Sequence, residues 1–369
     1  MNSELTSAIP PLEVGPPKMS IGVAGWIKKN LFNNWYNAIL TLLSLCLIYF
    51  AGSGLLSWGV QLARFAGSDP QACQGIEGAC WPVIKDNWAF FMVGIYPFEL
   101  RWRPLAALLL VAGLTLLAVS PQVRRMRGYH LAWFAAPLAV FFIIKGSESL
   151  GLQPVETRLW GGLMLTIILS VVGIVVAFPA GLALALGRQS KMPLIRLLSI
   201  CYIELIRGVP LITVLFMSSI MLPLFFPEGF NLDKVLRAQV GIILFAAAYQ
   251  AEVVRGGLQG VEKGQAEAAA ALGLGYWQTM VLIILPQALK IVIPSLVSGA
   301  ISLLKDTSLV VIIGLFDLLG VANLVLANPI WLGKMFETYI FVAALYWVMC
   351  FSMSRYARRL EIKFSAGGR

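Results

Sequence analysis

The chain has 369 residues, of which 59% are hydrophobic and only 12% are charged. Soluble domains carry roughly 25% charged residues, so this composition, with a mean hydropathy of +0.82, predicts a polytopic membrane protein and excludes an ordinary soluble enzyme. The net charge of +10 does not indicate nucleic-acid binding. The basic residues lie in short clusters beside apolar runs, as positive-inside sorting in a membrane predicts.

Residues 1–35 include the Pro-rich stretch IPPLEVGPPK and are expected to form a cytoplasmic N-terminal tail. A membrane-spanning helix needs about 20 mainly apolar residues. By this measure the fold is all-α with about eight transmembrane helices, near 36–58, 104–120, 131–147, 160–186, 200–222, 237–256, 283–304 and 337–354. The stretch 308–327 is apolar but interrupted by Gly314, Asp317 and Gly320, so we expect a partial or re-entrant helix that protein shields from lipid.

The basic clusters determine the expected orientation. Placing the N-terminus in the cytoplasm puts three clusters and the C-terminal tail 358–369 on that side. These clusters are Arg124–Arg127, Arg188–Arg196 and Arg355–Lys363. The polar loop that contains Cys73 and Cys80 then lies outside, where a disulfide between them is possible.

The residue types that catalysis or metal binding would need are scarce. His130 is the single histidine, and no Cys/His group has metal-ligand spacing, so neither a metal site nor a catalytic triad is expected. No G-x-x-x-x-G-K-[ST] phosphate loop is present. We therefore expect a chain that is not an enzyme, holds no cofactor and takes any energy from ATP through another subunit.

The stretch 267–286 reads EAAAALGLGYWQTMVLIILP and lies between two apolar spans. The alanines that follow Glu267 are good helix formers with small side chains, which let another protein approach the backbone closely. Gly273 can take the left-handed conformation that closes a helix, and Pro286 suits the first turn of the next helix. Glu267 is expected to accept a hydrogen bond that holds the shape of the loop.

This spacing resembles the cytoplasmic coupling loop of permease subunits in ATP-binding-cassette (ABC) importers, where a short helix docks into a groove on a separate ATPase. The resemblance implies that the loop 262–276 transmits movement from the ATPase to the spans. The residues that it assigns to coupling are Glu267, Ala268, Ala269, Gly273, Ile283, Leu285 and Pro286. The alternative, an Ala-rich helix without a partner, does not explain the distant Ile-x-Leu-Pro.

A polar segment, KGSESLGLQPVETRLW, separates two apolar blocks near 147–158. The second block, 158–357, resembles the five-helix core of type I ABC importer permeases for polar amino acids. The first, 36–147, has three helices and a loop expected to face outside. Such an extension resembles the longer permeases of general L-amino-acid uptake systems, and a scaffold or assembly role is expected for it.

Two Glu/Arg pairs lie near the expected ends of spans. Glu204 and Arg207 in ELIRGVPLI are one helical turn apart and are expected to pair, as are Glu252 and Arg255 in AEVVRGG. The Gly-Val-Pro after the first pair loosens the helix and marks a pivot. A structural or gating role is predicted for both pairs, and both segments resemble the amino-acid subfamily.

The most polar interruption of an apolar region is Lys305, Asp306, Thr307 and Ser308. Charged residues at membrane depth cost about 2.5–3.5 kcal/mol each on insertion scales, so they tend to pair or to line a water-filled path. Two interpretations stay open. The four residues contact the zwitterionic head of an amino acid in the pathway, or Lys305 and Asp306 form an internal salt bridge that breaks the helix.

Together, these resemblances imply a permease subunit of an ABC importer that moves L-amino acids across the inner membrane. Its implied partners are ATPase subunits that hold ATP and Mg²⁺, a periplasmic amino-acid-binding protein, membrane lipid and a second permease subunit, preferably an unequal one. The alternative is a secondary transporter or channel driven by an ion gradient. No inverted repeat or pair of discontinuous helices, which such carriers often have, is evident.

Overall fold

The computed structural model describes residues 22–66, 73, 75–117, 123, 127–227 and 232–366. The first 21 residues of the expected tail and the basic residues Arg124 and Arg125 lie outside these ranges. Regular structure in the described residues is helical, apart from isolated β-bridges. The chain divides into two compact units, Met1–Trp81 and Pro82–Arg369.

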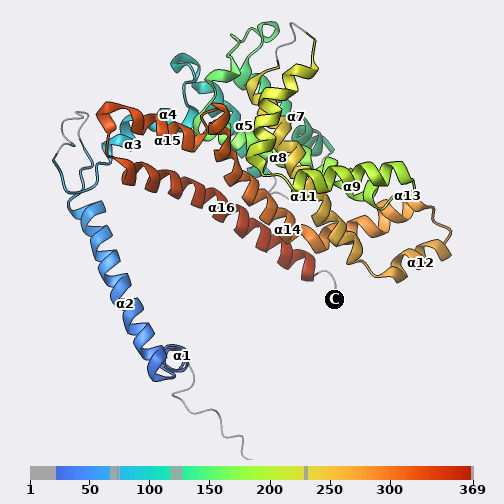
Figure 1. Ribbon diagram of the computed structural model, residues 1–369, viewed down its shortest axis with the longest axis horizontal. Coiled ribbons are helices and arrows are strands. Elements are labelled where there is room, and N and C mark those ends of the chain that lie inside the picture. Colours follow the sequence, from blue (N-terminus) through green and yellow to red (C-terminus); the bar gives the residue numbers. More distant parts are fainter. Residues whose placement is uncertain are drawn as a thin grey trace, which may run out of the picture. The chain divides into compact units, whose positions relative to one another are not determined.

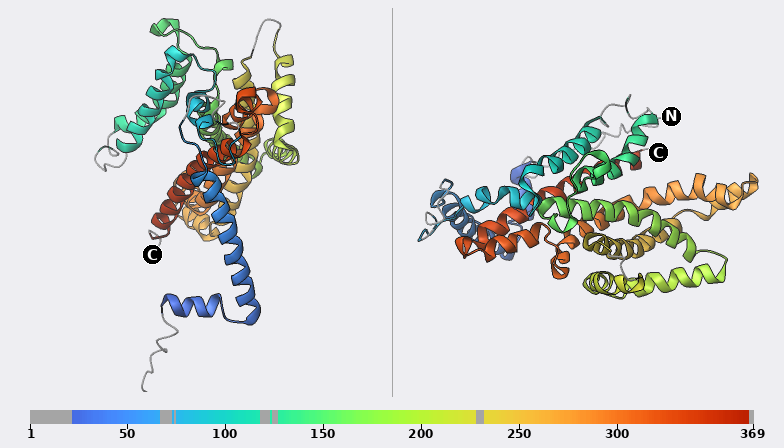
Figure 2. Two further views of the ribbon diagram at one scale, coloured as in Figure 1. Left: turned by 90° about the vertical axis from the view of Figure 1, so that its left-hand side faces the viewer. Right: turned by 90° about the horizontal axis from the view of Figure 1, so that it is seen from above.

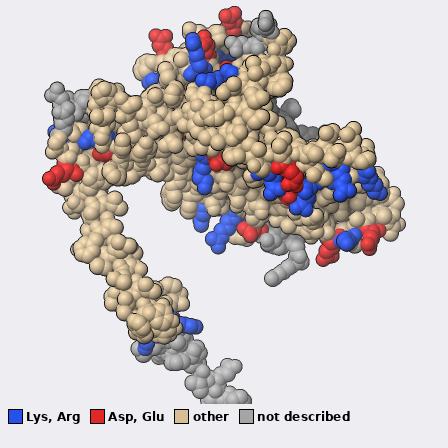
Figure 3. Space-filling view, in the orientation of Figure 1, with Lys and Arg blue, Asp and Glu red and all other residues tan. Residues whose placement is uncertain are grey.

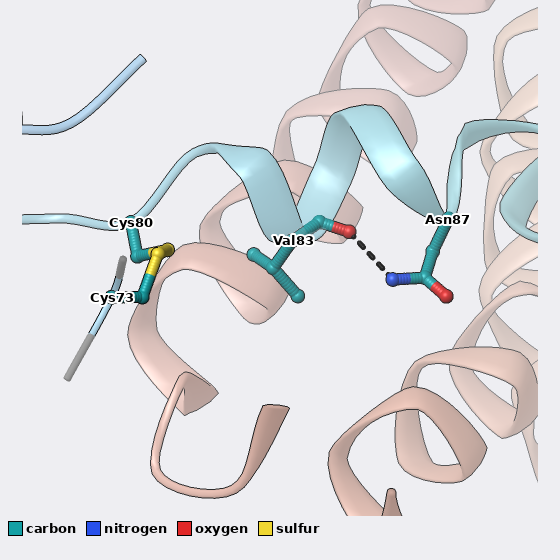
Figure 4. The surroundings of a disulfide bond; sticks show 4 residues. All are labelled: Cys73, Cys80, Val83 and Asn87. Atoms are coloured by element: carbon teal, nitrogen blue, oxygen red, sulfur yellow. Dashed lines mark hydrogen bonds between the residues drawn. A yellow bond between two sulfur atoms is a disulfide. The ribbon is translucent and has the colours of Figure 1, made fainter. Parts of the chain in front are cut away.

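The first unit contains helix α1 (Val23–Asn30) and helix α2 (Trp35–Leu56), which continues into a π-helical turn, Ser57–Gln61 (Figure 1). Its large side chains are mostly exposed, as in a helix whose apolar surface faces lipid. After this helix Cys73 and Cys80 form a disulfide, with their Cα atoms 5.9 Å apart (Figure 4). The Trp81 indole donates a hydrogen bond to the Gly59 carbonyl oxygen, 2.9 Å away.

The second unit begins with two short helices, α3 (Pro82–Asp86) and α4 (Trp88–Val93). Two longer helices follow, α5 (Trp102–Leu117) and α7 (Arg127–Lys145), and these two pack against each other. Buried polar groups attach them to the rest of the unit. The Tyr96 hydroxyl donates to the Ile144 carbonyl oxygen over 2.6 Å. Arg103, which is 2% exposed, donates to the Gln153 carbonyl oxygen, also over 2.6 Å.

The centre of the second unit is the pair α8 (Gly162–Arg188) and α11 (Lys234–Gln259), which lie side by side in Figures 1 and 2. Small residues allow their close approach. A Cβ atom at Gly181 would lie 2.9 Å from the Ala247 carbonyl oxygen, closer than real Cβ atoms come. Such small-residue contacts are typical of helix pairs in membranes, where packing replaces the hydrophobic effect.

The stretch expected to form one straight span at 200–222 is instead sharply bent. The chain forms α9 (Pro193–Arg207) and α10 (Leu211–Phe216), followed by a π-helical turn, Met217–Met221, and the two helical arms meet at 108°. Pro210 lies in the break; it has no backbone N–H and disfavours helical geometry in the residue before it. The interruption expected at the Gly-Val-Pro sequence is confirmed as a sharp bend, and its role as a pivot stays a prediction.

After α12 (Lys263–Ala271), one continuous helical segment runs from Tyr276 to Ile313. It comprises α13 (Tyr276–Thr279), a π-helical turn (Met280–Ile284), α14 (Leu285–Asp306) and a 3-10 helix (Thr307–Ile313). The chain then breaks at Gly314, in left-handed geometry with φ 73°, before α15 (Leu318–Ala327) and α16 (Met335–Ala366). Short 3-10 helices lie at Phe98–Leu100, Glu148–Leu150, Thr157–Leu159, Leu222–Phe225 and Pro329–Trp331.

The expected interrupted stretch 308–327 is therefore confirmed, with its break between Gly314 and Asp317. Gly320 does not interrupt it, because this residue lies inside α15. The Phe316 carbonyl oxygen in the break accepts a hydrogen bond from the Gly162 backbone N–H, 2.9 Å away, so the start of α8 holds the broken segment.

In the described ranges, four helical segments are long and apolar enough to cross a membrane, or five if the bent pair is one span. They are Trp35–Gln61, Gly162–Arg188, Tyr276–Ile313 and Met335–Arg359, with the bent pair Pro193–Arg207 and Leu211–Phe225. The protein is thus a multi-pass, all-helical membrane protein.

Candidate functional site

The loop singled out by its sequence folds as helix α12 with a glycine-based cap. The Gly273 N–H donates to the Ala270 carbonyl oxygen (3.0 Å) and the Leu274 N–H to that of Ala269 (3.1 Å). These two bonds, with Gly273 at φ 77°, form a Schellman motif. The expected left-handed conformation of Gly273 is therefore confirmed.

Helix α12 is exposed on almost its whole surface. Ala269 is the one buried residue in it, and Glu267, Ala268 and Ala270 are exposed. Just beyond its cap, Leu272 is 79% exposed and Trp277 is 67% exposed. A short Ala-rich helix with large apolar side chains in solvent next to it is a surface that another protein can cover.

The Ile-x-Leu-Pro sequence lies against this helix. Ile283 belongs to the π-helical turn that α12 contacts. Leu285 packs into the apolar cluster that also contains Ala251 and Ala288. Gln287, one residue after Pro286, donates both to the Ile283 carbonyl oxygen (2.9 Å) and to the Gln265 side chain in α12 (3.2 Å). The two separated halves of the sequence pattern are thus one structural unit, with α12 on the surface and the Ile-x-Leu-Pro helix behind it.

The Glu267 side chain is exposed. Among the described residues it accepts no hydrogen bond, so its expected role as an acceptor that shapes the loop is wrong. The Schellman cap and the Gln265–Gln287 contact hold the loop instead.

Five charged side chains from three helices meet close to the start of α12; we call Arg188, Glu204, Arg207, Glu252 and Arg255 the Glu252 cluster. Glu252 accepts from Arg255 over 2.9 Å and from Arg188 over 2.9 Å, and Arg207 lies 3.5 Å from it. Arg188 also reaches Glu204, 2.8 Å away. Figure 3 shows acidic and basic side chains gathered at the end of the core that carries α9, α12 and α13.

The Glu252–Arg255 pair is confirmed, but the pair expected between Glu204 and Arg207 is wrong. Glu204 pairs with Arg188 at the end of α8, and Arg207 turns to Glu252. The Glu252 side chain is only 15% exposed, against 55% for Glu204. A shielded carboxylate attracts cations more strongly than one in water, because solvent screens the exposed charge.

The remaining contacts extend the cluster along α11. The Arg207 guanidinium group lies over the Tyr249 ring, 5.6 Å from the ring centroid. Arg255 also donates to Gln259, the last residue of α11, over 2.8 Å. The cluster therefore joins the ends of α8, α9 and α11 at the point where the chain leaves for α12.

The polar residues 305–308 lie where α14 passes into the 3-10 helix. Thr307 is buried and donates to the carbonyl oxygen three residues earlier, whereas Lys305 is exposed. Within the described part of the chain Lys305 and Asp306 form no ion pair, because successive residues on a helix do not face each other. The helix continues to Gly314, so the salt bridge expected to break it is wrong. A contact of residues 305–308, Ser308 included, with a substrate stays a prediction.

A second polar group holds the broken segment, and the role of its residues was not foreseen. Asp317 is fully buried; it caps α15 by accepting from the Gly320 N–H (2.9 Å) and also accepts from the Tyr346 hydroxyl (3.1 Å). The Leu318 N–H donates to Thr166 Oγ1 in α8, 3.0 Å away. The signal in the sequence was an Asp directly before an apolar run, which is typical of a helix N-cap.

An exposed helix capped by glycine, set on a bundle of apolar helices, defines the class of this protein as a multi-pass membrane protein with a short surface helix between two long helical segments. Residues 177–365 match the family described as binding-protein-dependent transport system inner membrane component. The chain belongs to this family.

Three relatives illustrate the match. The inner membrane amino-acid ABC transporter permease protein YhdY of Escherichia coli (strain K12) is 50% identical over 347 residues, 93% of each chain. The glutamate/glutamine/aspartate/asparagine transport system permease protein BztC of Rhodobacter capsulatus is 37% identical over 94% of this chain and 95% of its own. The probable glutamine permease GlnP of Bacillus subtilis is 35% identical over 205 residues, which are 56% of this chain and 93% of its own.

Proposed function

We propose that this chain passes polar L-amino acids inward through the membrane and that helix α12 receives the movement of the ATPase. The chain is the permease subunit of an amino-acid ABC importer in the inner membrane, and it is not itself catalytic. Polar amino acids are proposed because the relative BztC is named for glutamate, glutamine, aspartate and asparagine. Family membership replaces the alternative of a carrier driven by an ion gradient.

The observation that carries the coupling proposal is the near-complete exposure of α12 beside the Glu252 cluster. Ala269 is the one buried residue of α12. Because most helical stability in proteins comes from packing, the rest of this chain stabilises α12 only a little. A groove on the ATPase would cover Ala268, Ala270 and Leu272. Movement of α12 would then reach α8 and α9 through the contacts of Arg255 with Gln259 and Glu252.

We further propose eight spans, three in the extension 36–147 and five in the permease core 158–357. The extension would use α2, α5 and α7, and the core would use α8, the bent pair α9–α10, α11, the segment 276–313 and α16. GlnP supports this division, because it aligns with 205 residues of this chain over 93% of its own length. The tail before residue 36 and the tail 358–369 would both lie in the cytoplasm.

The proposed assembly contains two ATPase subunits that hold ATP and Mg²⁺, a periplasmic amino-acid-binding protein and a second permease. The family description supports a binding protein, and the name of the relative YhdY, an ABC transporter permease, supports an ATPase. An unequal second permease is proposed because the extension makes this chain longer than relatives such as GlnP. Residues 305–308 are proposed to border the substrate path, since a charge at that depth is best tolerated beside water or a partner.

Cross-linking tests the coupling proposal. Ala270→Cys is made in a chain whose cysteines 46, 201 and 350 are serine, and it is labelled with a photoactivatable maleimide in the complete transporter. We expect cross-links to the ATPase from Ala270→Cys and none from Leu224→Cys, which is 79% exposed at the other end of the core. Labelling of Ala270→Cys by an impermeant reagent added outside intact cells would refute the proposal.

Transport measurements test the energy source. Uptake into vesicles should need internal ATP and the binding protein, and it should persist when the proton gradient is collapsed. Uptake that stops with the gradient while ATP is still present would contradict an ATP-driven permease.

A further inference from the structure

A cavity of about 500 Å³ opens at the end of α11 opposite to α12. Its walls come from the π-helical turn after α10, the first turn of α11 and the 3-10 end of the segment 276–313, with Ser219, Lys234, Arg237 and Ile313 among the lining residues. Small-molecule sites commonly have volumes of this order. Helix α11 has 26 residues, so at 1.5 Å per residue its two ends are about 39 Å apart. If α12 is on the cytoplasmic side, the cavity lies at the outer side.

The charges that face this cavity are two cations. Lys234 and Arg237 lie one turn apart on α11, and the residues that line the cavity include no carboxylate. In the described ranges neither side chain forms an ion pair. The neighbouring carboxylate of Asp233 is engaged elsewhere. It accepts from the backbone N–H groups of Val235 and Leu236 and from the hydroxyl of Thr157.

The structure fixes Arg237 by a hydrogen bond and places the Lys234 side chain beside Gly314. Arg237 Nη1 donates to the Ser219 carbonyl oxygen, 2.5 Å away in the π-helical turn, and Arg237 Nε is buried and has no partner among the described residues. Lys234 Nζ lies against Gly314, where a Cβ atom would be 3.0 Å from it. Gly314 is favoured at this position by its left-handed φ of 73°.

Two cationic side chains without a neighbouring carboxylate carry a high free-energy cost close to a membrane, unless water or an anion compensates their charge. A guanidinium group beside an ammonium group suits a carboxylate, which both groups can bind through charge-assisted hydrogen bonds. Every amino acid carries an α-carboxylate, and acidic amino acids carry a second carboxylate in the side chain. A basic amino acid carries an additional positive charge in its side chain, which both cations would repel.

We propose that this cavity receives a carboxylate of the amino acid as it enters the permease, and that Lys234 and Arg237 favour acidic and neutral amino acids over basic ones. The proposal rests on the proposed function, because it assigns a substrate charge to the same transport path. It makes the permease contribute to selectivity, in addition to the binding protein.

Uptake by the complete transporter, with L-glutamate, L-glutamine and L-arginine as probes, tests this. The measured quantity is the ratio of glutamate uptake to glutamine uptake. The same binding protein serves the wild type and every variant, so its own preference cancels when the ratio of a variant is divided by that of the wild type. Lys234→Gln and Arg237→Gln should each lower this ratio about two- to fivefold, the range of a solvent-accessible charge pair. Arg237→Lys keeps the charge and should preserve the ratio. Lys85→Gln and Arg158→Gln remove exposed charges elsewhere and should also preserve it.

A second measurement does not depend on the binding protein. In the purified permease–ATPase complex, Ile220→Cys places a thiol on the cavity wall, and millimolar L-glutamate should slow its reaction with a maleimide. The protection should be lost with Lys234→Gln. This variant keeps the hydrogen bond of Arg237 to the Ser219 carbonyl oxygen, so it serves as the test if Arg237→Gln fails to assemble.

Two results would overturn the proposal: an unchanged glutamate-to-glutamine ratio in both charge-neutral variants, or no protection of Ile220→Cys. Absence of uptake for all three amino acids would instead contradict the proposed function and, with it, this inference.

Discussion

The carboxylate of Glu252 in α11 accepts a hydrogen bond from Arg188 Nη1 at the end of α8, 64 residues earlier, over 2.9 Å. This contact closes the Glu252 cluster. Without it the end of α8 would have no polar attachment to the turn of α11 that leads into α12. The cluster thereby gives the proposed coupling helix a rigid base.

Glu252→Gln should destabilise the protein, because three guanidinium groups would lose their shared carboxylate. We expect a loss of about 1–3 kcal/mol, measured as a lower thermal unfolding midpoint of the purified complex. Glu204→Gln is the matched control, since its side chain is 55% exposed and, among the described residues, pairs with Arg188 alone; it should cost at most about 1 kcal/mol. Equal losses from the two variants would contradict a central role of Glu252.

Gly273→Ala should impair ATP-dependent uptake. A residue with a Cβ atom costs about 1–2 kcal/mol in left-handed geometry, so the cap of α12 would open and the helix would lose its orientation. Gly273→Asp and Glu267→Lys, which also alter the surface offered to the ATPase, should abolish uptake while the chain still reaches the membrane.

Uptake rates normalised to the amount of membrane-inserted protein measure these effects. Gly256→Ala is the control, because this glycine lies in α11 with open space around it and an ordinary φ. Normal transport by Gly273→Asp and Glu267→Lys would refute the docking role of α12.

Asp317→Ala should loosen the segment between Gly314 and α15. It leaves the Gly320 N–H and the Tyr346 hydroxyl without their acceptor, at an expected cost of about 2–4 kcal/mol. Tyr346→Phe removes one hydrogen bond and should cost only about 0.6–2 kcal/mol. Resistance to unfolding by SDS, followed by intrinsic fluorescence, measures both. A larger loss for Tyr346→Phe than for Asp317→Ala would contradict the capping role.

The Cys73–Cys80 disulfide should be accessible from outside the cell. An impermeant maleimide should label Cys73 and Cys80 in intact cells only after treatment with an impermeant reductant. A Cys73→Ala/Cys80→Ala variant serves as the unlabelled control. Labelling that requires permeabilised cells would reverse the proposed orientation of the N-terminal helices.

Much of the architecture was predictable from local patterns. Long apolar runs predicted α2, α8 and the start of α16 within a few residues, because about 20 apolar residues are needed to cross lipid whatever their neighbours are. Gly273 was predictable as the end of α12 because a helix cap depends only on residues within one or two turns.

Other features were beyond such patterns. The span expected at 200–222 is bent by 108°, and the strength of a Pro-induced bend depends on what the freed backbone packs against. The partner of Glu204 is Arg188 and not the nearby Arg207, because helix α8 brings in a guanidinium group that local spacing does not reveal.

From its sequence alone, this protein is determined to be a multi-pass membrane protein with an Ala-rich loop helix closed by a glycine, because hydropathy and helix capping act over short stretches of chain. The tertiary structure decided which charges share Glu252, how Asp317 holds the broken segment, and that Lys234 and Arg237 face one cavity without a carboxylate. These are contacts between residues far apart in the chain, and only the packing of helices brings them within hydrogen-bond distance.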